Sequence, residues 1–363
     1  MQKLLYIAPH LSTGGLPQYL VKKIELLKQD FEIYLVEWVD CTGGVFVVQR
    51  DKIINLIKPN QFYTLGEDKT QLLNIVKNIN PNIIHLEEIP EYFMDSDIAQ
   101  KIYSTDRKYH IVETSHDSSF DTTQKQYFPD KFMFVSDWQI QQYKDLDIPK
   151  VLIEYPIEYI NRPNRTESLI ALDLDPTKKH ILHVGLFTPR KNQEEFFKYA
   201  KSLPEYEFHC LGNQADNFQS YWKPLMDGKP SNLTWWGERA DVDKFYESMD
   251  LFLFTSRGTN NDKETMPLVI REALSNKIPQ LLYNLPVYLN YFDKFDSIKY
   301  LEYEDFNQNC ELIKSELTET PVKSLQDEVF IISTHPNTDS IINTTLDCVK
   351  TVQSYGYKVI LTS

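Results

Sequence analysis

The sequence predicts an α/β protein built from two doubly wound domains, each a parallel sheet covered by helices on both faces. Short apolar segments alternate with segments of helical periodicity, and this alternation starts near the N-terminus and starts again near residue 180. Glycines and charged side chains gather in loops that follow the predicted strands, where open α/β sheets bind ligands. The chain has 363 residues, of which 42% are hydrophobic, and this is enough for two cores.

The first predicted domain covers residues 1–163. Its apolar segments are short, as strands are, and the segments between them repeat with the helical period. We expect strands at residues 4–8, 31–38, 83–86, 110–113 and 132–135, and helices at 17–28, 69–78 and 137–146. Longer loops of this domain lie around residues 41–51 and 87–97.

The second predicted domain covers residues 164–322. Residues 161–165 and 173–179 are polar, contain proline and are typical of a linker, after which the alternation restarts. We expect strands at residues 180–184, 207–211, 233–236, 251–255 and 280–283, and helices at 193–203, 241–248, 267–275 and 307–317. The repeated pattern predicts a cleft between two domains of the same type.

The last segment, residues 323–363, is predicted to be a βαβ extension. Strands at 328–333 and 358–361 flank a helix at 340–355. One such unit cannot bury both faces of its sheet. We therefore expect it either to pack on the second domain or to begin a further, truncated domain of a larger protein.

Composition excludes several classes of function. The net charge of −14 argues against a nucleic-acid partner, which needs a basic surface. No apolar run reaches the roughly 18 residues of a membrane span, and no polybasic cluster indicates peripheral membrane contact. The four widely spaced cysteines lack metal-ligand spacing and indicate reduced thiols in the cytoplasm. The oligomeric state stays open.

Two carboxylates, Glu264 and Glu272, stand eight positions apart at the start of an apolar segment. Eight residues are slightly more than two helical turns, so a helix that begins near Pro267 could turn both toward one site. The start of a helix offers free backbone N–H groups and a positive dipole end, which suit a phosphate. Carboxylates that bind sugar hydroxyls beside such a helix predict a nucleotide-sugar site.

Two loops add candidates for the same site. Arg190 and Lys191 follow the first strand of the second domain and could neutralise a diphosphate, although a solvated basic pair is the alternative. Gly14 and Gly15 follow the first strand of the chain and would let a ligand approach the backbone, although any tight turn can use glycine. The third glycine of a dinucleotide-binding fingerprint is absent.

These features together resemble the retaining glycosyltransferases of family 4, which have the two-domain GT-B fold. The resemblance covers most of residues 1–320 and is carried, in order, by Gly14-Gly15, Val135-Ser136-Asp137, Val184-Gly185 with Arg190-Lys191, Leu211-Gly212, Trp236-Gly237, Tyr246 to Asp250, Phe254-Thr255-Ser256, and Glu264 with Glu272.

The resemblance also implies roles for individual residues. Glu272 would bind the ribose, Glu264 the hydroxyls of the donor sugar near the reacting carbon, and Arg190 with Lys191 the departing diphosphate. His116 matches the active-site histidine beside the donor sugar, with a buried structural histidine as the alternative. The remaining donor-binding positions implied are Gly14, Gly15, Gly185, Met266 and Leu268.

The sequence departs from the family pattern in the donor site. Leu186 stands where an arginine usually follows the glycine, so Arg190 would be its substitute. Thr265 and Pro267 replace glycines after the first glutamate, and a proline removes one backbone donor. No metal or cofactor is expected. Three Asp-x-Asp pairs, at 95–97, 145–147 and 173–175, are typical of solvated turns rather than of a metal site.

The resemblance implies transfer of a sugar from a UDP- or GDP-sugar to a glycan or other hydroxyl acceptor, with retention and without a metal. The acceptor would meet the first domain, at its variable loops around residues 41–51 and 87–97. A phosphorylase or sugar-nucleotide hydrolase on the same scaffold is one alternative. A catalytically silent GT-B module that serves in binding or assembly within a larger protein is another.

Overall fold

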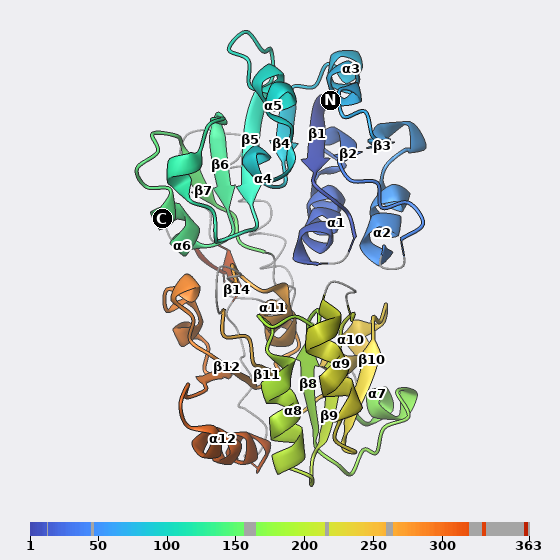
Figure 1. Ribbon diagram of the computed structural model, residues 1–363, viewed down its shortest axis with the longest axis vertical. Coiled ribbons are helices and arrows are strands. Elements are labelled where there is room, and N and C mark those ends of the chain that lie inside the picture. Colours follow the sequence, from blue (N-terminus) through green and yellow to red (C-terminus); the bar gives the residue numbers. More distant parts are fainter. Residues whose placement is uncertain are drawn as a thin grey trace.

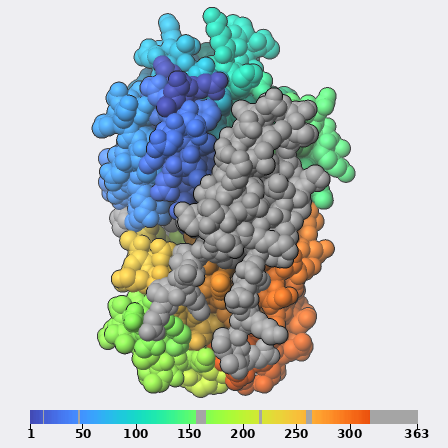
Figure 2. Space-filling view, turned by 180° about the vertical axis from the view of Figure 1, so that it is seen from behind, coloured from blue at the N-terminus to red at the C-terminus, as the bar shows by residue number. Residues whose placement is uncertain are grey.

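The structure is a computed structural model that describes residues 1–12, 14–44, 47–155, 165–214, 218–258 and 264–318, and the backbone of residues 329–331 and 359–361. Two parallel sheets, each with helices around it, lie one above the other (Figure 1). The space-filling view from behind shows the first domain, blue to green, above the second, yellow-green to orange (Figure 2). The expected fold of two doubly wound domains is therefore confirmed.

The first sheet has seven strands in the order β3-β2-β1-β4-β5-β6-β7. The interior strand β1 pairs in parallel with β2 on one side and β4 on the other, so that Leu5 is in register with Tyr34 and Ile84. Strand order reverses between β1 and β4, and the loops after these two strands therefore diverge and leave a crevice at the carboxyl edge. The strands are β1 (Gln2–Ala8), β2 (Phe31–Glu37), β3 (Phe62–Thr64), β4 (Ile83–Leu86), β5 (His110–Ser115), β6 (Lys131–Phe134) and β7 (Lys150–Leu152).

The second sheet has six strands in the order β10-β9-β8-β11-β12-β13. The same reversal occurs between β8 and β11, and it opens a second crevice whose carboxyl edge faces the first domain. The strands are β8 (His180–Val184), β9 (Glu207–Leu211), β10 (Leu233–Gly237), β11 (Leu251–Phe254), β12 (Gln280–Leu282) and β13 (Ile298–Tyr300).

Helices cover both sheets. Those of the first domain are α1 (Gly15–Leu27), α2 (Val48–Leu56), α3 (Gln71–Ile79), α4 (Pro90–Phe93), α5 (Ser96–Ile102) and α6 (Asp137–Gln142), with short 3₁₀ turns η1 (Pro59–Gln61) and η2 (Thr122–Gln124). Those of the second are α7 (Arg165–Ala171), α8 (Gln193–Ser202), α9 (Gln219–Asp227), α10 (Val242–Ser248), α11 (Leu268–Ser275) and α12 (Phe306–Thr318), with η4 (Pro286–Tyr288) and η5 (Tyr291–Lys294).

Burial explains why the apolar segments became strands. All four residues of β11 are buried, as both faces of a parallel strand between helices must be. His183 of β8 and His209 of β9 are both buried. The first domain has separate cores on the two faces of its sheet, one centred on Leu5 and Ile84 and the other on Tyr6 and Leu20.

Several elements differ from the prediction. The three-residue strands β3, β7 and β13 and the helices α2, α5 and α9 were not expected. The predicted helix at 137–146 ends at Gln142, and α7 begins at Arg165, inside the predicted linker.

The correction that bears most on function concerns α11. Pro267 is its N-cap and the helix begins at Leu268, so Glu264 precedes the helix instead of sharing a face with Glu272.

The C-terminal extension is described only in part. β14 (Val329–Ile331) and β15 (Val359–Leu361) pair in parallel as a separate two-stranded sheet, as the βαβ prediction requires. The predicted helix between them, at residues 340–355, lies outside the described residues. The proposed boundaries at 163 and 322 remain predictions.

Candidate active site

A cavity of about 470 Å³ lies between the two domains. The loops that follow β8, β9 and β10 supply its wall on the second domain, together with the start of α11. The loop between β1 and α1 supplies much of the wall on the first domain. The carboxyl edges of both sheets thus face one space, and all the predicted site residues lie on it: Gly14, Gly15, His116, Gly185, Arg190, Lys191, Glu264, Met266, Leu268 and Glu272.

The first-domain loop comes close to α11. Gly14 has φ +117°, a conformation that a side chain would strain, and it is the N-cap of α1. The next residue, Gly15, is so near the second domain that an added Cβ would lie 3.5 Å from the Leu268 side chain. Two predicted donor-binding residues therefore meet across the domains.

Two loops of the second domain pack backbone against backbone. Gly212 has φ +137°, and a Cβ built there would lie 2.0 Å from the carbonyl oxygen of Gly185. Only glycine fits at position 212. This close packing fixes the loop that leads from Gly185 to Lys191.

Lys191 and Glu264 form the charged centre of the site. The Lys191 ammonium lies 2.6 Å from Oε1 of Glu264, which also accepts a hydrogen bond from the Ser256 hydroxyl at 2.8 Å. The guanidinium of Arg190 lies 3.8 Å from the same oxygen. Burial alone would raise the pKa of Glu264, but Lys191 and Arg190 outweigh it and hold the pKa below its usual value. Glu264 is therefore ionised, and the two predicted diphosphate-binding cations lie beside it.

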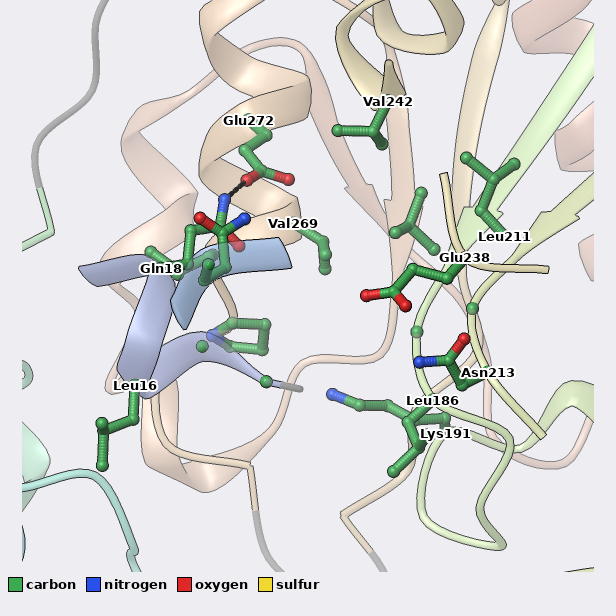
Figure 3. Close-up of a pocket in the computed structure, with 18 of the residues that line it drawn as sticks. Leu16, Gln18, Leu186, Lys191, Leu211, Asn213, Glu238, Val242, Val269 and Glu272 are labelled. Atoms are coloured by element: carbon green, nitrogen blue, oxygen red, sulfur yellow. Dashed lines mark hydrogen bonds between the residues drawn. The ribbon is translucent and has the colours of Figure 1, made fainter. Parts of the chain in front are cut away.

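Glu272 is held by neutral donors instead. Its Oε2 accepts a hydrogen bond from the Tyr246 hydroxyl at 2.7 Å, and its Oε1 accepts one from the Gln18 amide of the first domain. Figure 3 shows Gln18 reaching Glu272 on one side of the cavity, while Lys191 extends into it from another. Burial raises the pKa of Glu272 in spite of both hydrogen bonds.

His116 lines the cavity with its polar groups already bonded within the protein. Nε2 lies 3.2 Å from the Glu87 carboxylate and Nδ1 lies 2.9 Å from the Tyr155 hydroxyl. The backbone N–H donates to Glu88, and the carbonyl accepts from the Thr265 hydroxyl. Burial lowers the pKa of His116, so the ring is neutral, with the proton on Nε2 facing the carboxylate.

A buried network supports this histidine. Glu87 forms an ion pair with Lys23. Burial alone would raise the pKa of Glu87, but Lys23 and two histidines outweigh burial and lower this pKa. Among the described residues no cation pairs with its neighbour Glu88, and burial raises the pKa of Glu88 to about 8. Sequence reasoning missed these residues, although Glu87 and Glu88 directly follow β4 at the first crevice and so carried a signal.

The start of α11 lines the cavity, but its N-cap residue is a proline. Pro267, at the N-cap, has no N–H to offer an anion, whereas Leu268 and Val269 of the first turn line the cavity. Met266 lines the cavity but is 4% exposed and packs in the second-domain core. Its side chain therefore acts mainly in packing.

No group of side chains among the described residues has the arrangement of a metal site. At one of the predicted solvated turns, Asp175 accepts hydrogen bonds from the backbone N–H and the hydroxyl of Thr177. Over the same part of the chain, no helix is both long and apolar enough to cross a membrane.

Comparison with known proteins agrees with the fold. Residues 164–308 match the family model "Glycosyl transferases group 1", so the match covers the second domain. The fold and this match define a two-domain protein of the GT-B type with a glycosyltransferase group 1 region.

Individual relatives add detail. A processive diacylglycerol alpha-glucosyltransferase of Acholeplasma laidlawii is 27% identical over 163 residues, which are 43% of this chain and 48% of that protein. The aligned part therefore spans about half the length of this curated relative.

Solved structures share the whole architecture. HepE of Anabaena in complex with UDP and glucose has a TM-score of 0.69 and 14% identity to this chain, and the aligned part is 88% of this chain and 90% of the HepE chain. A glycosyltransferase of Rickettsia africae has a TM-score of 0.65 and 13% identity, and the aligned part is 87% of this chain and 88% of that protein's chain. At these identities the likeness establishes the GT-B fold alone.

Proposed function

We propose that the protein is a retaining glycosyltransferase that moves a sugar from a nucleoside diphosphate sugar to a hydroxyl acceptor without a metal. The observation that carries this proposal is the cavity between the domains, in which Lys191 and Arg190 lie beside the Glu264 carboxylate and Glu272 lies across from them. The binding of UDP and UDP-glucose by HepE, and the name of the Acholeplasma relative, support a UDP-sugar as donor.

The charged groups suit the chemistry of such a transfer. The bond between the anomeric carbon and the diphosphate oxygen breaks, and negative charge develops on the leaving diphosphate. Lys191 and Arg190 would stabilise that charge, because preorganised cations in a partly buried site lose little energy to reorganisation. Glu264 would accept hydrogen bonds from the sugar hydroxyls, and Glu272 from the ribose.

Retention of the anomeric configuration follows from the direction in which we propose that the acceptor oxygen attacks. The acceptor oxygen forms its new bond on the face that the diphosphate leaves, and its proton passes to the departing diphosphate. This same-face route needs no enzyme nucleophile. His116, which is neutral and fixed by Glu87 and Tyr155, would form the wall beside the donor sugar.

Closure of the domains would keep water out of the reaction. Several polar bonds already cross between the domains at the cavity or beside it, among them Gln18 with Glu272, Ser118 with Glu264, Thr265 with His116, and Arg271 with Tyr155. A closed site limits hydrolysis of the donor.

The test is a donor screen with product analysis. The full-length protein is incubated with UDP-glucose, UDP-galactose and GDP-mannose, with and without diacylglycerol or a simple glycoside, in the presence and absence of EDTA. We expect glycoside with retained anomeric configuration and no effect of EDTA. Inverted product or inhibition by EDTA would contradict the mechanism. Donor hydrolysis alone would identify a hydrolase, and no donor binding at all would identify a silent module.

A further inference from the structure

The carboxylate of Glu272 is held by one donor from each domain. Tyr246 of α10 binds Oε2 from the second domain, and Gln18 of α1 binds Oε1 from the first. Figure 3 shows the Gln18 amide directed at Glu272 beside the open part of the cavity. Both donors are neutral, so they fix the orientation of the carboxylate and leave its charge for a ligand.

From this geometry we propose that Gln18 is a nucleotide-positioning residue, which orients Glu272 toward the ribose only when the domains are closed. The proposal rests on the proposed function and deepens it. A carboxylate offers about four lone-pair directions, and Gln18 and Tyr246 occupy two of them. Two remain for the vicinal diol of a ribose, which offers two O–H donors.

The position of Gln18 explains why the bond depends on closure. Gln18 lies in the first turns of α1, just after the Gly14-Gly15 loop that contacts Leu268. Its amide reaches Glu272 because the start of α1 contacts the start of α11, whereas Tyr246 belongs to the same domain as Glu272 and stays with it in any domain arrangement. Opening of the domains would remove one of the two constraints on the carboxylate.

Nucleotide binding measured by calorimetry tests the proposal. The ligands are UDP and 2′,3′-dideoxy-UDP, or the corresponding guanosine pair if the wild-type protein binds GDP. The variants are Gln18→Ala, Gln18→Glu and, as a matched control, Gln141→Ala, which replaces an exposed glutamine of α6 in the same domain. Thermal melts check that each variant is folded.

We expect Gln18→Ala to weaken UDP binding by about tenfold, the effect of one hydrogen bond to a charged group, and to leave binding of the dideoxy nucleotide almost unchanged. Gln18→Glu should weaken UDP binding further, because it places a second carboxylate against Glu272. The control should match the wild type.

Other outcomes overturn the inference. Unchanged or tighter UDP binding by Gln18→Ala would show that Gln18 does not position Glu272. An equal loss for both ligands would show a general structural role instead. Failure of the wild-type protein to bind either UDP or GDP would overturn the proposed function and the inference with it, whereas the first two results would leave the proposed function intact.

Discussion

Thr265 donates a hydrogen bond to the backbone carbonyl oxygen of His116, 2.9 Å away, and so joins the loop before α11 to the loop after β5. Close by, the Ser118 hydroxyl donates to the backbone carbonyl of Glu264 at 2.8 Å, in the opposite direction between the domains. The segment that carries Glu264 is therefore fixed from the first domain. Thr265, which departs from the glycine of the family pattern, has a clear structural use.

Replacement of Thr265 by valine tests this link, because it keeps the shape of the side chain and removes the hydroxyl. We expect the KM for the donor to rise about tenfold and the free energy of unfolding to fall by only about 1 kcal/mol, the usual effect of one hydrogen bond. Steady-state kinetics and denaturant unfolding measure the two effects. Thr318→Val, at an exposed helix end, is the control. Wild-type kinetics in Thr265→Val would show that the link does not shape the donor site.

Gly212 offers a test of the loop packing beneath the site. Alanine at this position would combine an unfavourable φ with a Cβ 2.0 Å from the Gly185 carbonyl oxygen. We expect Gly212→Ala to lower the free energy of unfolding by about 3 kcal/mol and to reduce donor binding, since the Gly185 loop must shift. Gly66→Ala is the control, because no atom lies within 4 Å of its added Cβ, and it should change stability by less than about 1 kcal/mol. Equal stability of the two variants would refute the argument.

Much of the fold could be predicted because buried parallel strands are short apolar runs. β8 and β11 have this form. The order of such strands along the chain predicts which loops lie at the carboxyl edge of a sheet, where the crevices are. The edge strands β3, β7 and β13 have three residues each, which is too short for a periodic signal. They form because a neighbouring strand offers them hydrogen bonds. That neighbour comes from another part of the chain, so the local sequence does not show it.

The sequence predicted which residues belong to the site, but not the contacts that they make with one another. Glu264, Lys191 and Glu272 were recognised from their order along the chain, yet the pairing of Lys191 with Glu264 depends on the packing of two loops. Gln18 and Tyr246 are ordinary helix residues by sequence. Their contacts with Glu272 arise from how α1 and α10 approach α11, which no local pattern records.

Glu88 predicts a pH dependence of stability. Its pKa in the folded protein is about 8, raised by burial, whereas an exposed glutamate titrates near 4.3. A group with a raised folded pKa contributes stability below its unfolded pKa, and this contribution is lost as pH rises through the folded value. The Glu88 contribution should therefore decline from about pH 4.5 to about pH 8. Glu88→Gln removes this titration. The stability of the variant relative to the wild type should rise over that range, as measured by denaturant unfolding at several pH values. A constant difference would show that Glu88 is ionised throughout.

Lys191 serves both stability and the proposed reaction, and two variants separate these roles. Lys191→Ala leaves the buried Glu264 with only Arg190 nearby, so we expect the free energy of unfolding to fall by about 2–3 kcal/mol at neutral pH and transfer to be lost. The lowered pKa of Glu264 contributes stability above the unfolded pKa, near 4.3, so this loss should shrink as pH falls below that value. The double variant Lys191→Met with Glu264→Gln removes both charges and should recover most of the stability but no activity. Lys179→Ala, which breaks an exposed pair with Asp250, should cost less than about 1 kcal/mol. An active double variant would show that neither charge takes part in transfer.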